Sequence, residues 1–328
     1  MSNLFLKPFD TPFQTVPFND IKQEDFQPAI MQSIEDAKAE VNAIVADTAP
    51  ATFRNTIIAL EHTGKQLGIV TEAFFNLTSA ETNDYLEKVQ EEISPVLAEY
   101  GNDITLNEDL FQRVKAVYEQ IDKTALSGED LRLLDKTYKS FTRNGALLSE
   151  EDKMKLRAID KELASVKVKF SQNVLHETNA YVLHLTEEAE LAGIPESIKT
   201  QAREEATKRK LEGWVFTLQY PSFVPFMTYA ANRERRKEMH LASGTKAFGS
   251  NEYNNEANIK RIVKLRDERA QLLGFASHAA FVLEERMAGN PDNVFTFLND
   301  LLEKAKPFAA KDIDSLKPLA LKDGIETI

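Results

Sequence analysis

Apolar residues recur every three or four positions along most of this chain, which is the spacing of helices buried along one side. The longest run begins at Ser149, a helix-capping residue followed by three acids, and continues to about Thr178. The serine side chain satisfies free backbone donors, and the acids suit the positive end of a helix. The run predicts a helix of about 30 residues. Its apolar positions are Leu156, Ile159, Leu163, Val166 and Phe170.

Five more helices are predicted before this one, after an N-terminal segment of a different kind. Residues 3–20 alternate phenylalanine with proline, and this density of proline blocks helices and favours extended chain. We interpret the segment as an extended strap pinned across helices by its aromatic side chains, the alternative being a disordered leader. Pro95 predicts a kink or an irregular turn in the third helix. The predicted helices span about Ile21–Ala46, Thr52–Leu77, Thr82–Leu97, Asn107–Ile121 and Ser127–Gly145.

The apolar period changes after the long helix. Two short runs, Tyr181–Leu185 and Trp214–Gln219, are rich in aromatic, β-branched and other apolar residues, and the second lies between Gly213 and Pro221. Such runs predict a pair of strands, the only sheet in the chain. Irregular core segments are the alternative.

Helical spacing returns around and after the strand pair. One helix is predicted between the strands and four after them, with Pro307 and Pro318 falling inside the last helix or breaking it. No period of about 30–45 residues recurs, so an array of helical repeats is disfavoured. These helices span about Pro195–Lys210, Arg233–Ala242, Asn255–Leu273 and Ser277–Arg286, with the last one starting at Asn290-Pro291.

The whole pattern predicts an all-α, mainly helical fold, a multi-helix bundle with one small β pair near 181–185 and 214–219. We expect two parts in the chain. Residues 1–148 hold the strap and a helical bundle. Residues 149–328 hold the long helix, the β pair and a second helical set.

Charge and cysteine content narrow the classes of function. The 328 residues include 52 acidic and 40 basic side chains, a net charge of −12, which argues against a nucleic-acid partner because phosphate binding needs a positive face. With no cysteine, disulfides, thiolate nucleophiles and Cys-ligated zinc are excluded. The N-terminus lacks a signal-peptide pattern, and no apolar stretch approaches the ~20 residues that cross a bilayer. We therefore expect a soluble chain with no membrane partner.

His176-Glu177, near the end of the long predicted helix, is half of the zinc-peptidase motif His-Glu-x-x-His. Ala180 stands where the second histidine is needed, and no two of the five histidines have the i, i+4 spacing of a helical zinc pair. Glu61-His62 has no second ligand in sequence either. We interpret both as polar residues of helices, because a histidine suits the negative end of a helix.

Two other features could carry chemistry. Residues 245–248 lie between Gly244 and Gly249 but lack the spacing of a phosphate-binding loop, so we interpret them as a polar loop. The basic run Arg233–Lys237 is interleaved with glutamate and fits a solvated helix face. A positive patch for an anionic group, such as a peptide C-terminus, is the alternative. Nucleophile elbows are absent from the sequence, and from the residues we name no catalytic, cofactor-binding or metal-binding position.

Seven segments carry a likeness to known proteins: Thr52–Glu61, Phe74–Ala80 with Thr82-Asn83, Leu110–Val114, Lys169–Leu175, Ala189–Gly193, Leu265–Phe275 and Arg286–Ala288. In this order they resemble the M3 zinc peptidases, the thimet oligopeptidase family, along nearly the whole chain. Each segment alone is weak, whereas the ordered set is specific. Asn76–Asn83 and Lys210–Trp214 are similar to the bacterial peptidyl-dipeptidase (dipeptidyl carboxypeptidase) branch.

The resemblance implies a fold and a place for this chain within it. Members of the family are mainly helical and about twice this length, with two halves that face each other across a channel for short peptides. Their zinc ligands lie in the C-terminal half. The resemblance therefore implies that this chain is the N-terminal, non-catalytic portion of a zinc-dependent peptidyl-dipeptidase, truncated before the catalytic zinc domain and forming one wall of the substrate channel.

The implied parent is a hydrolase that removes dipeptides from the C-terminus of short peptides. Zinc is expected in the full-length parent and not in this chain, which we expect to be inactive because it lacks His-Glu-x-x-His. The implied partners are short peptides and the chain's own missing C-terminal half, and the implied location is cytoplasmic, or else periplasmic. Two alternatives stay open: a stand-alone helical peptide-binding or scaffold module without catalysis, and a self-sufficient peptidase that uses His176-Glu177.

Overall fold

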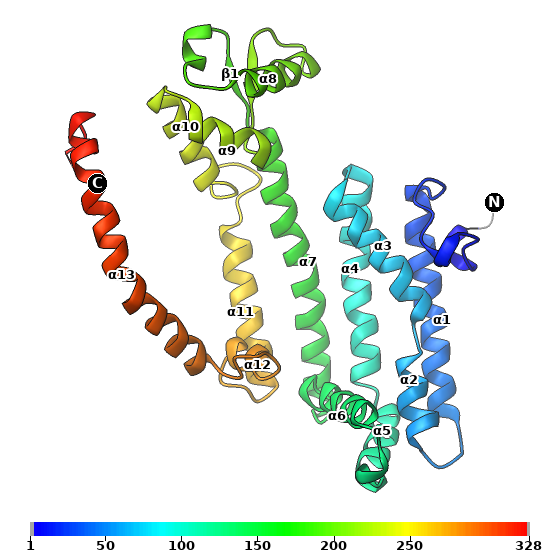
Figure 1. Cartoon of the computed structure of the whole chain (residues 1–328). Coiled ribbons are helices and arrows are strands. Elements are labelled where there is room, and N and C mark those ends of the chain that lie inside the picture. Colours follow the sequence, from blue (N-terminus) through cyan, green and yellow to red (C-terminus); the bar gives the residue numbers. More distant parts are fainter. Residues whose placement is uncertain (1–2, 327–328) are drawn as a thin grey trace. The chain divides into compact units, whose positions relative to one another are not determined.

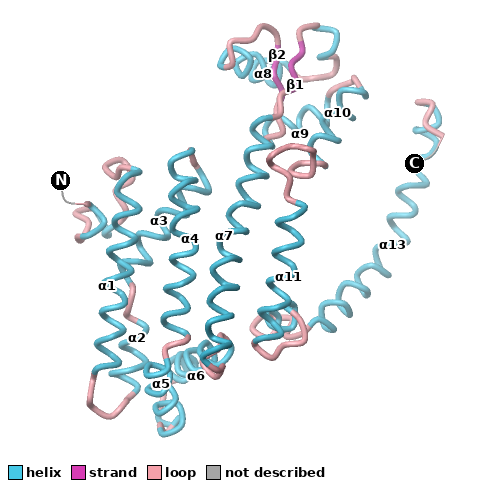
Figure 2. The backbone as a smooth tube through the Cα atoms, turned by 180° about the vertical axis from the view of Figure 1, so that it is seen from behind, coloured by secondary structure: helices cyan, strands magenta, loops and turns pink. Residues whose placement is uncertain are grey.

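The computed structural model describes residues 3–326 and is mainly helical, as the apolar spacing predicts (Figures 1 and 2). It divides into two units, Met1–Leu265 and Arg266–Ile328. The boundary expected between residues 148 and 149 stays a prediction. The helices are α1 (Phe26–Ala46), α2 (Ala59–Glu61), α3 (Lys65–Ala80), α4 (Asp84–Thr105), α5 (Glu108–Gln120), α6 (Gly128–Arg143), α7 (Glu150–Ala180), α8 (Glu196–Lys208), α9 (Tyr220–Tyr229), α10 (Arg233–Gly244), α11 (Glu256–Leu272), α12 (His278–Leu283) and α13 (Pro291–Lys322).

The first core of unit 1 lies between α1, α3 and α4. Phe26 and Phe74 are completely buried there, with ring centroids 5.4 Å apart. The N-terminal strap adds Phe5, which is also fully buried. Its ring centroid lies 5.0 Å from that of Phe26. Phe9 packs against the same core, whereas Phe13 is fully exposed. The expected pinning of the strap is therefore confirmed for Phe5 and Phe9 and wrong for Phe13.

The long helix α7 begins where the sequence predicts and packs along α4. The Ser149 hydroxyl accepts a hydrogen bond from the backbone N–H of Asp152 at 3.2 Å, which is the expected cap. Farther along the helix, the Gln172 side chain donates to the backbone carbonyl of Glu87 on α4 at 3.1 Å. These contacts make α7 the element that joins the α1–α6 bundle to the segments after it.

The two predicted strands exist and pair with each other. β1 (Leu183–Leu185) runs antiparallel to β2 (Trp214–Phe216), with Leu183 opposite Phe216. Figure 2 shows them in magenta, next to α8. Their inward side chains build a separate core with α8, α9 and α10, centred on Phe216 and Phe226. The alternative of two irregular segments is thereby excluded.

The helix predicted over Thr52–Leu77 is wrong as one continuous element. Residues 53–58 form a π-helical turn, α2 follows, and α3 starts only at Lys65. The break lies at Gly64, whose φ of 68° is the left-handed conformation that glycine adopts without strain. Apolar spacing alone missed the break because Leu60 and Leu67 continue the helical period across it.

Other predicted boundaries shift in smaller ways. The cap of α4 is Asn83 rather than Thr82, because the Asn83 side chain accepts from the backbone N–H groups of Tyr85 and Leu86. Helix α9 was not predicted, since two of its positions are prolines, although Pro221 in the first turn is compatible with a helix. Pro95 lies inside α4, and Pro307 and Pro318 lie inside α13. Neither helix is interrupted at these prolines.

Unit 2 contains the C-terminal end of α11, then α12 and α13. The Ser277 hydroxyl caps α12 by accepting from the backbone N–H of Ala280, and Asn290 caps α13 in the same way by accepting from Asn293. Helix α13 has 32 residues, and α12 packs against it. Within residues 3–326, no helix joins the length to the apolar character that a membrane crossing requires.

Candidate functional site

The half-motif His176-Glu177 lies in the last turn of α7, beside the loop that joins α10 to α11. His176 Nε2 is 2.8 Å from the Glu87 carboxylate on α4. The imidazole ring also stacks on Tyr253 of the loop, with centroids 5.5 Å apart and an angle of 14° between the planes. One ring therefore contacts both a neighbouring helix and the loop.

Glu177 uses both of its carboxylate oxygens within this region. One oxygen accepts a hydrogen bond from the backbone N–H of Ala247 at 2.9 Å. The other accepts from the Asn251 side-chain amide, also at 2.9 Å. Ala247 is buried and has a φ of 56°, so the carboxylate holds a loop residue in a left-handed conformation that a non-glycine residue rarely adopts.

Two buried asparagines complete the attachment of the loop to α7. Asn173 and Asn255 are each 1% exposed, and the Asn173 amide donates to the Asn255 side-chain oxygen at 2.9 Å. Asn255 in turn donates to the backbone carbonyl of Phe170 at 2.9 Å, and its backbone N–H donates to Ala247 at 2.7 Å. The Asn173 side-chain oxygen is buried and has no hydrogen-bond partner among the described residues, so the attachment of the loop rests on these three hydrogen bonds.

These residues do not fit a zinc site. A catalytic zinc ion needs about three protein ligands in a cluster, and among residues 3–326 no group of three or more His, Asp or Glu side chains is arranged to hold a metal ion. His184, the next histidine, is exposed on β1. Its Nε2 atom lies 2.6 Å from the backbone carbonyl oxygen of Glu212. His62 is exposed at the C-terminal cap of α2. The geometry thus gives His176-Glu177 a structural role.

The two remaining sequence candidates are also occupied by structural contacts. In the basic run of α10, Arg235 pairs with Glu190 and Glu238, each at 2.8 Å. Arg236 donates to the backbone carbonyl groups of Ala230 and Ala231. The polar loop after Gly244 directs the N–H of Ala247 at Glu177, so that donor is not available to a phosphate.

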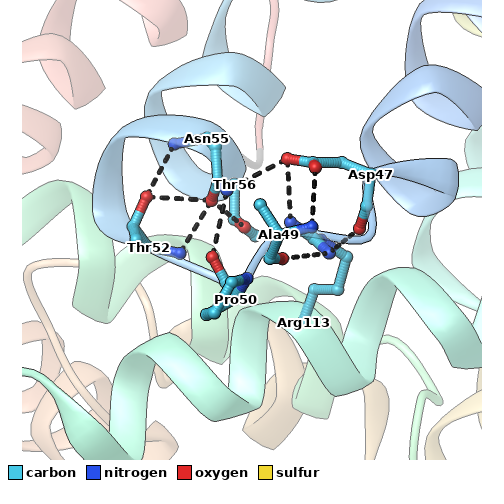
Figure 3. Close-up of polar contacts among 7 residues, drawn as sticks. All are labelled: Asp47, Ala49, Pro50, Thr52, Asn55, Thr56 and Arg113. Carbon is cyan, nitrogen blue, oxygen red and sulfur yellow. Dashed lines mark hydrogen bonds and ion pairs between the residues drawn. The ribbon is translucent and has the colours of Figure 1, made fainter.

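The segment Thr52–Glu61, which carries part of the family resemblance, begins with a polar cluster (Figure 3). Thr52 and Asn55 cap each other reciprocally: the Asn55 side-chain oxygen accepts from Thr52 N–H at 2.7 Å, and the Thr52 hydroxyl accepts from Asn55 N–H at 3.1 Å. The Asn55 amide also donates to Asp47 at 3.0 Å. Arg113 on α5 donates to the backbone carbonyl of Asp47 at 2.6 Å and fixes the other side of the loop.

Sequence reasoning missed Asp47 and Arg113, which are 66 positions apart and share no local pattern. It also missed Tyr181, at the boundary between α7 and β1. Burial raises the pKa of Tyr181 to about 12, with a further increase from Glu238 and an opposing effect of Arg235. The Tyr181 hydroxyl is buried and, within the described residues, has no hydrogen-bond partner. The only available signal was its place at the change of apolar period.

Comparison with known proteins gives matches along nearly the whole chain. Residues 226–327 match the protein family described as "Peptidase family M3". The dipeptidyl carboxypeptidase of Escherichia coli (strain K12) is 32% identical over 316 residues, which are 96% of this chain and 46% of that protein. The dipeptidyl carboxypeptidase of Salmonella typhimurium is 34% identical over 296 residues, 90% of this chain and 44% of that protein. Oligopeptidase A of Escherichia coli (strain K12) is 32% identical over 317 residues, 95% of this chain and 47% of that protein.

The chain spans about half the length of the curated relatives it matches. The family match covers the end of α9 and all of α10 to α13, and the matches to the relatives extend over the α1–α6 bundle as well. The family resemblance carried by the seven short segments is confirmed by the match of residues 226–327 to peptidase family M3 and by the similarity of nearly the whole chain to these named peptidases.

Proposed function

We propose that this chain is the N-terminal, non-catalytic portion of a zinc-dependent peptidase that acts on short peptides. The observation that carries the proposal is the extent of the alignments. Almost all of this chain aligns with two named peptidases, but the alignment covers less than half of the length of each. The sequence contains half of the zinc motif at His176-Glu177 and no complete His-Glu-x-x-His. The catalytic residues are then supplied by the part of the enzyme that this chain does not match.

In this proposal the chain forms one wall of the substrate channel. Support comes from the rigidity of unit 1, where α7 is tied to α4 by Gln172 and to the α10–α11 loop by Asn173 and Glu177. A wall that excludes folded proteins must keep its shape, and hydrogen bonds between buried polar groups of different elements help to hold a fold in one conformation. Such a wall selects peptides by size without contributing to bond cleavage.

The first candidate activity is removal of dipeptides from the C-terminus of short peptides. It is favoured by the segments Asn76–Asn83 and Lys210–Trp214, which are similar to the dipeptidyl carboxypeptidase branch. The second candidate is cleavage of oligopeptides at internal bonds, because oligopeptidase A matches with the same 32% identity. The two activities differ in whether a free peptide C-terminus is needed.

A fusion enzyme tests the proposal. The chain is joined to the part of Escherichia coli dipeptidyl carboxypeptidase outside the matched region, and a second fusion uses oligopeptidase A in the same way. Each fusion receives a short peptide with a free C-terminus and the same peptide with an amidated C-terminus. We expect zinc-dependent release of C-terminal dipeptides, from the free peptide only, in the first fusion. Cleavage of both peptides by both fusions would favour the oligopeptidase activity.

The isolated chain is the second arm of this test. We expect no peptide hydrolysis and no stoichiometric zinc from residues 1–328 alone. About one zinc per chain together with chelator-sensitive hydrolysis would overturn the non-catalytic assignment. Two folded but inactive fusions would favour the scaffold module.

We also infer a cytoplasmic location, with the periplasm as the alternative, and cell fractionation distinguishes the two.

A further inference from the structure

Helix α13 carries a long apolar stripe that is open to solvent. Ten large apolar side chains on this helix are each between 45% and 67% exposed. With 3.6 residues per turn, most of them fall on one side of the helix. The stripe is defined here by the residues Phe295, Phe297, Leu298, Leu301, Leu302, Phe308, Ile313, Leu316 and Leu319. The tenth residue, Leu321, projects from the opposite side.

Charged residues are sorted around the stripe. Lysines border it on both sides: Lys304, Lys311 and Lys322 on one side, and Lys306 and Lys317 on the other. Lys311 leans over the stripe, with its ammonium 5.5 Å from the Phe308 ring. Four acids, Asp292, Asp300, Glu303 and Asp314, face away from the stripe, and Asp312 is the acid within it. Lys304 and Lys317 already pair with Asp300 and Asp314, at 2.7 Å each. A partner with an apolar groove and acidic margins therefore complements the stripe and its other lysines, Lys306, Lys311 and Lys322.

The stripe is too extensive to be an ordinary solvent face. Burial of a Leu, Ile or Phe side chain stabilises a protein, and nine such side chains on α13 are left about half exposed. A contiguous apolar patch of this kind marks an interaction site. The match to peptidase family M3 runs through all of α13 to residue 327, so the helix belongs to the sequence shared with relatives about twice as long.

We infer that the α13 stripe is the docking surface for the polypeptide by which the M3 relatives exceed this chain. The inference rests on the proposed function, because it takes that polypeptide to be the catalytic portion. The length argument selects this occupant over a second copy: more than half of each matched relative has no counterpart in this chain. The occupant is a segment with an apolar groove, and acidic side chains at its margins meet the bordering lysines.

A binding experiment with separate polypeptides tests the inference. The probe is the part of Escherichia coli dipeptidyl carboxypeptidase outside the 316-residue match, and the corresponding part of oligopeptidase A is a second probe. Each is produced with residues 1–328, and the complex is measured by co-purification and by calorimetry. The positive control is the matched portion of the same Escherichia coli enzyme, which contains its own counterpart of α13.

The test variant is Leu301→Gln with Phe308→Gln, two stripe positions replaced by a good helix former. We expect binding at least about tenfold weaker, since truncation of central apolar side chains exceeds the 1.4 kcal/mol that corresponds to a factor of ten. The matched control is Leu321→Gln, the same chemical change on the opposite side of α13, which we expect to leave binding within about twofold. Far-UV circular dichroism checks that all variants keep their helices.

Any of three binding outcomes overturns the inference. Binding of neither probe, where the positive control binds, removes the proposed occupant. Stripe-dependent dimerisation of the chain in sedimentation velocity, without probe binding, assigns the stripe to a second copy. Stripe-dependent binding to phosphatidylglycerol vesicles assigns it to a membrane surface. Hydrolysis by the fusion enzyme is a separate readout. If the fusion is inactive but the probes bind through the stripe, the proposed function is contradicted and this inference is not. If the fusion is active but the stripe substitutions do not weaken probe binding, this inference is contradicted and the proposed function is not.

Discussion

The Glu177 carboxylate at the end of α7 accepts a hydrogen bond from the backbone N–H of Ala247, 2.9 Å away and 70 residues later in the chain. Its other oxygen accepts from the Asn251 side chain at 2.9 Å. In a zinc peptidase motif the same residue type would activate water. Here it stabilises a left-handed loop residue, so the chemistry that a short motif indicates depends on which groups the carboxylate meets.

Replacement of Glu177 by Ala tests this structural role. The change removes both acceptors and leaves the N–H of buried Ala247 without a partner, which costs about 1–3 kcal/mol of folding stability. Urea unfolding measures the change. Glu72→Ala, at an exposed position on α3, is the matched control and is expected to stay within about 0.5 kcal/mol. Equal stability of the two variants would contradict the role assigned to Glu177.

Tyr181 gives a prediction in alkaline solution. Burial raises the pKa of its hydroxyl from 10.0 to about 12, so the folded chain retains a proton that the unfolded chain releases. The resulting stability is fully present below pH 10 and is lost as the pH rises towards 12. In Tyr181→Phe this part of the alkaline destabilisation disappears, and stability at pH 7 is unchanged or higher because the buried hydroxyl has no partner among the described residues.

The measurement for Tyr181→Phe is urea unfolding at several pH values between 8 and 12, compared with the unsubstituted chain. The two curves are expected to be parallel up to about pH 10 and to diverge above it. The same alkaline decrease in both chains would show that another group controls unfolding there.

Gly213 precedes β2 and has a φ of 86°, and a Cβ atom at this position would meet the backbone carbonyl of Leu185 on β1. Gly213→Ala is therefore expected to separate the strand pair and to cost more than ~1–2 kcal/mol, because strain and a backbone clash act together. Gly101→Ala on α4 is the control: nothing lies near its Cβ, and alanine in a helix stabilises by about 0.5–1 kcal/mol. Thermal unfolding of both variants checks the opposite signs.

Local signals in the sequence were sufficient for much of the fold. Asn107, Ser127 and Ser149 were identified as helix starts, and each accepts the capping hydrogen bond that its residue type predicts. These assignments succeeded because a cap involves only the next two or three residues. The strand pair was likewise found from two runs whose composition differs from that of the flanking helices.

Contacts between distant segments could not be predicted in this way. Glu177 and Ala247 belong to different segments, and neither has a local pattern that names the other. The break at Gly64 was missed for a related reason: a single left-handed glycine ends a helix without interrupting the apolar period. For the candidate site, the sequence identified His176-Glu177 as half a motif, but only the positions of Glu87, Tyr253 and Ala247 explain what the two residues do.

Lys153 on α7 is a buried cation held by two exposed acids. Its side chain is 5% exposed, and its ammonium lies 3.2 Å from Glu108 and 2.9 Å from Glu150. Burial lowers the pKa of Lys153, but hydrogen bonds to the two carboxylates raise it more, so the net pKa is above 10.5. Hydrogen bonds from Gln112 and Lys153 hold the pKa of Glu108 below 4.5. The cluster therefore contributes its full stability between about pH 4.5 and 10.5 and loses it outside that range.

The two ways of breaking this cluster are expected to differ. Glu108→Gln with Glu150→Gln leaves a buried ammonium without a counter-charge, whereas Lys153→Met removes the charge and retains the apolar stem. Because an unpaired buried charge is more costly than an absent one, the double variant is expected to lose ~1–3 kcal/mol and Lys153→Met less than ~1.5 kcal/mol. Urea unfolding at pH 7 gives the order, and both differences should shrink as the pH is lowered below 4.5 and Glu108 gains its proton, because a neutral Glu108 no longer balances Lys153 even in the unsubstituted chain. A larger loss in Lys153→Met than in the double variant would mean that Lys153 stabilises α7 through contacts other than these carboxylates.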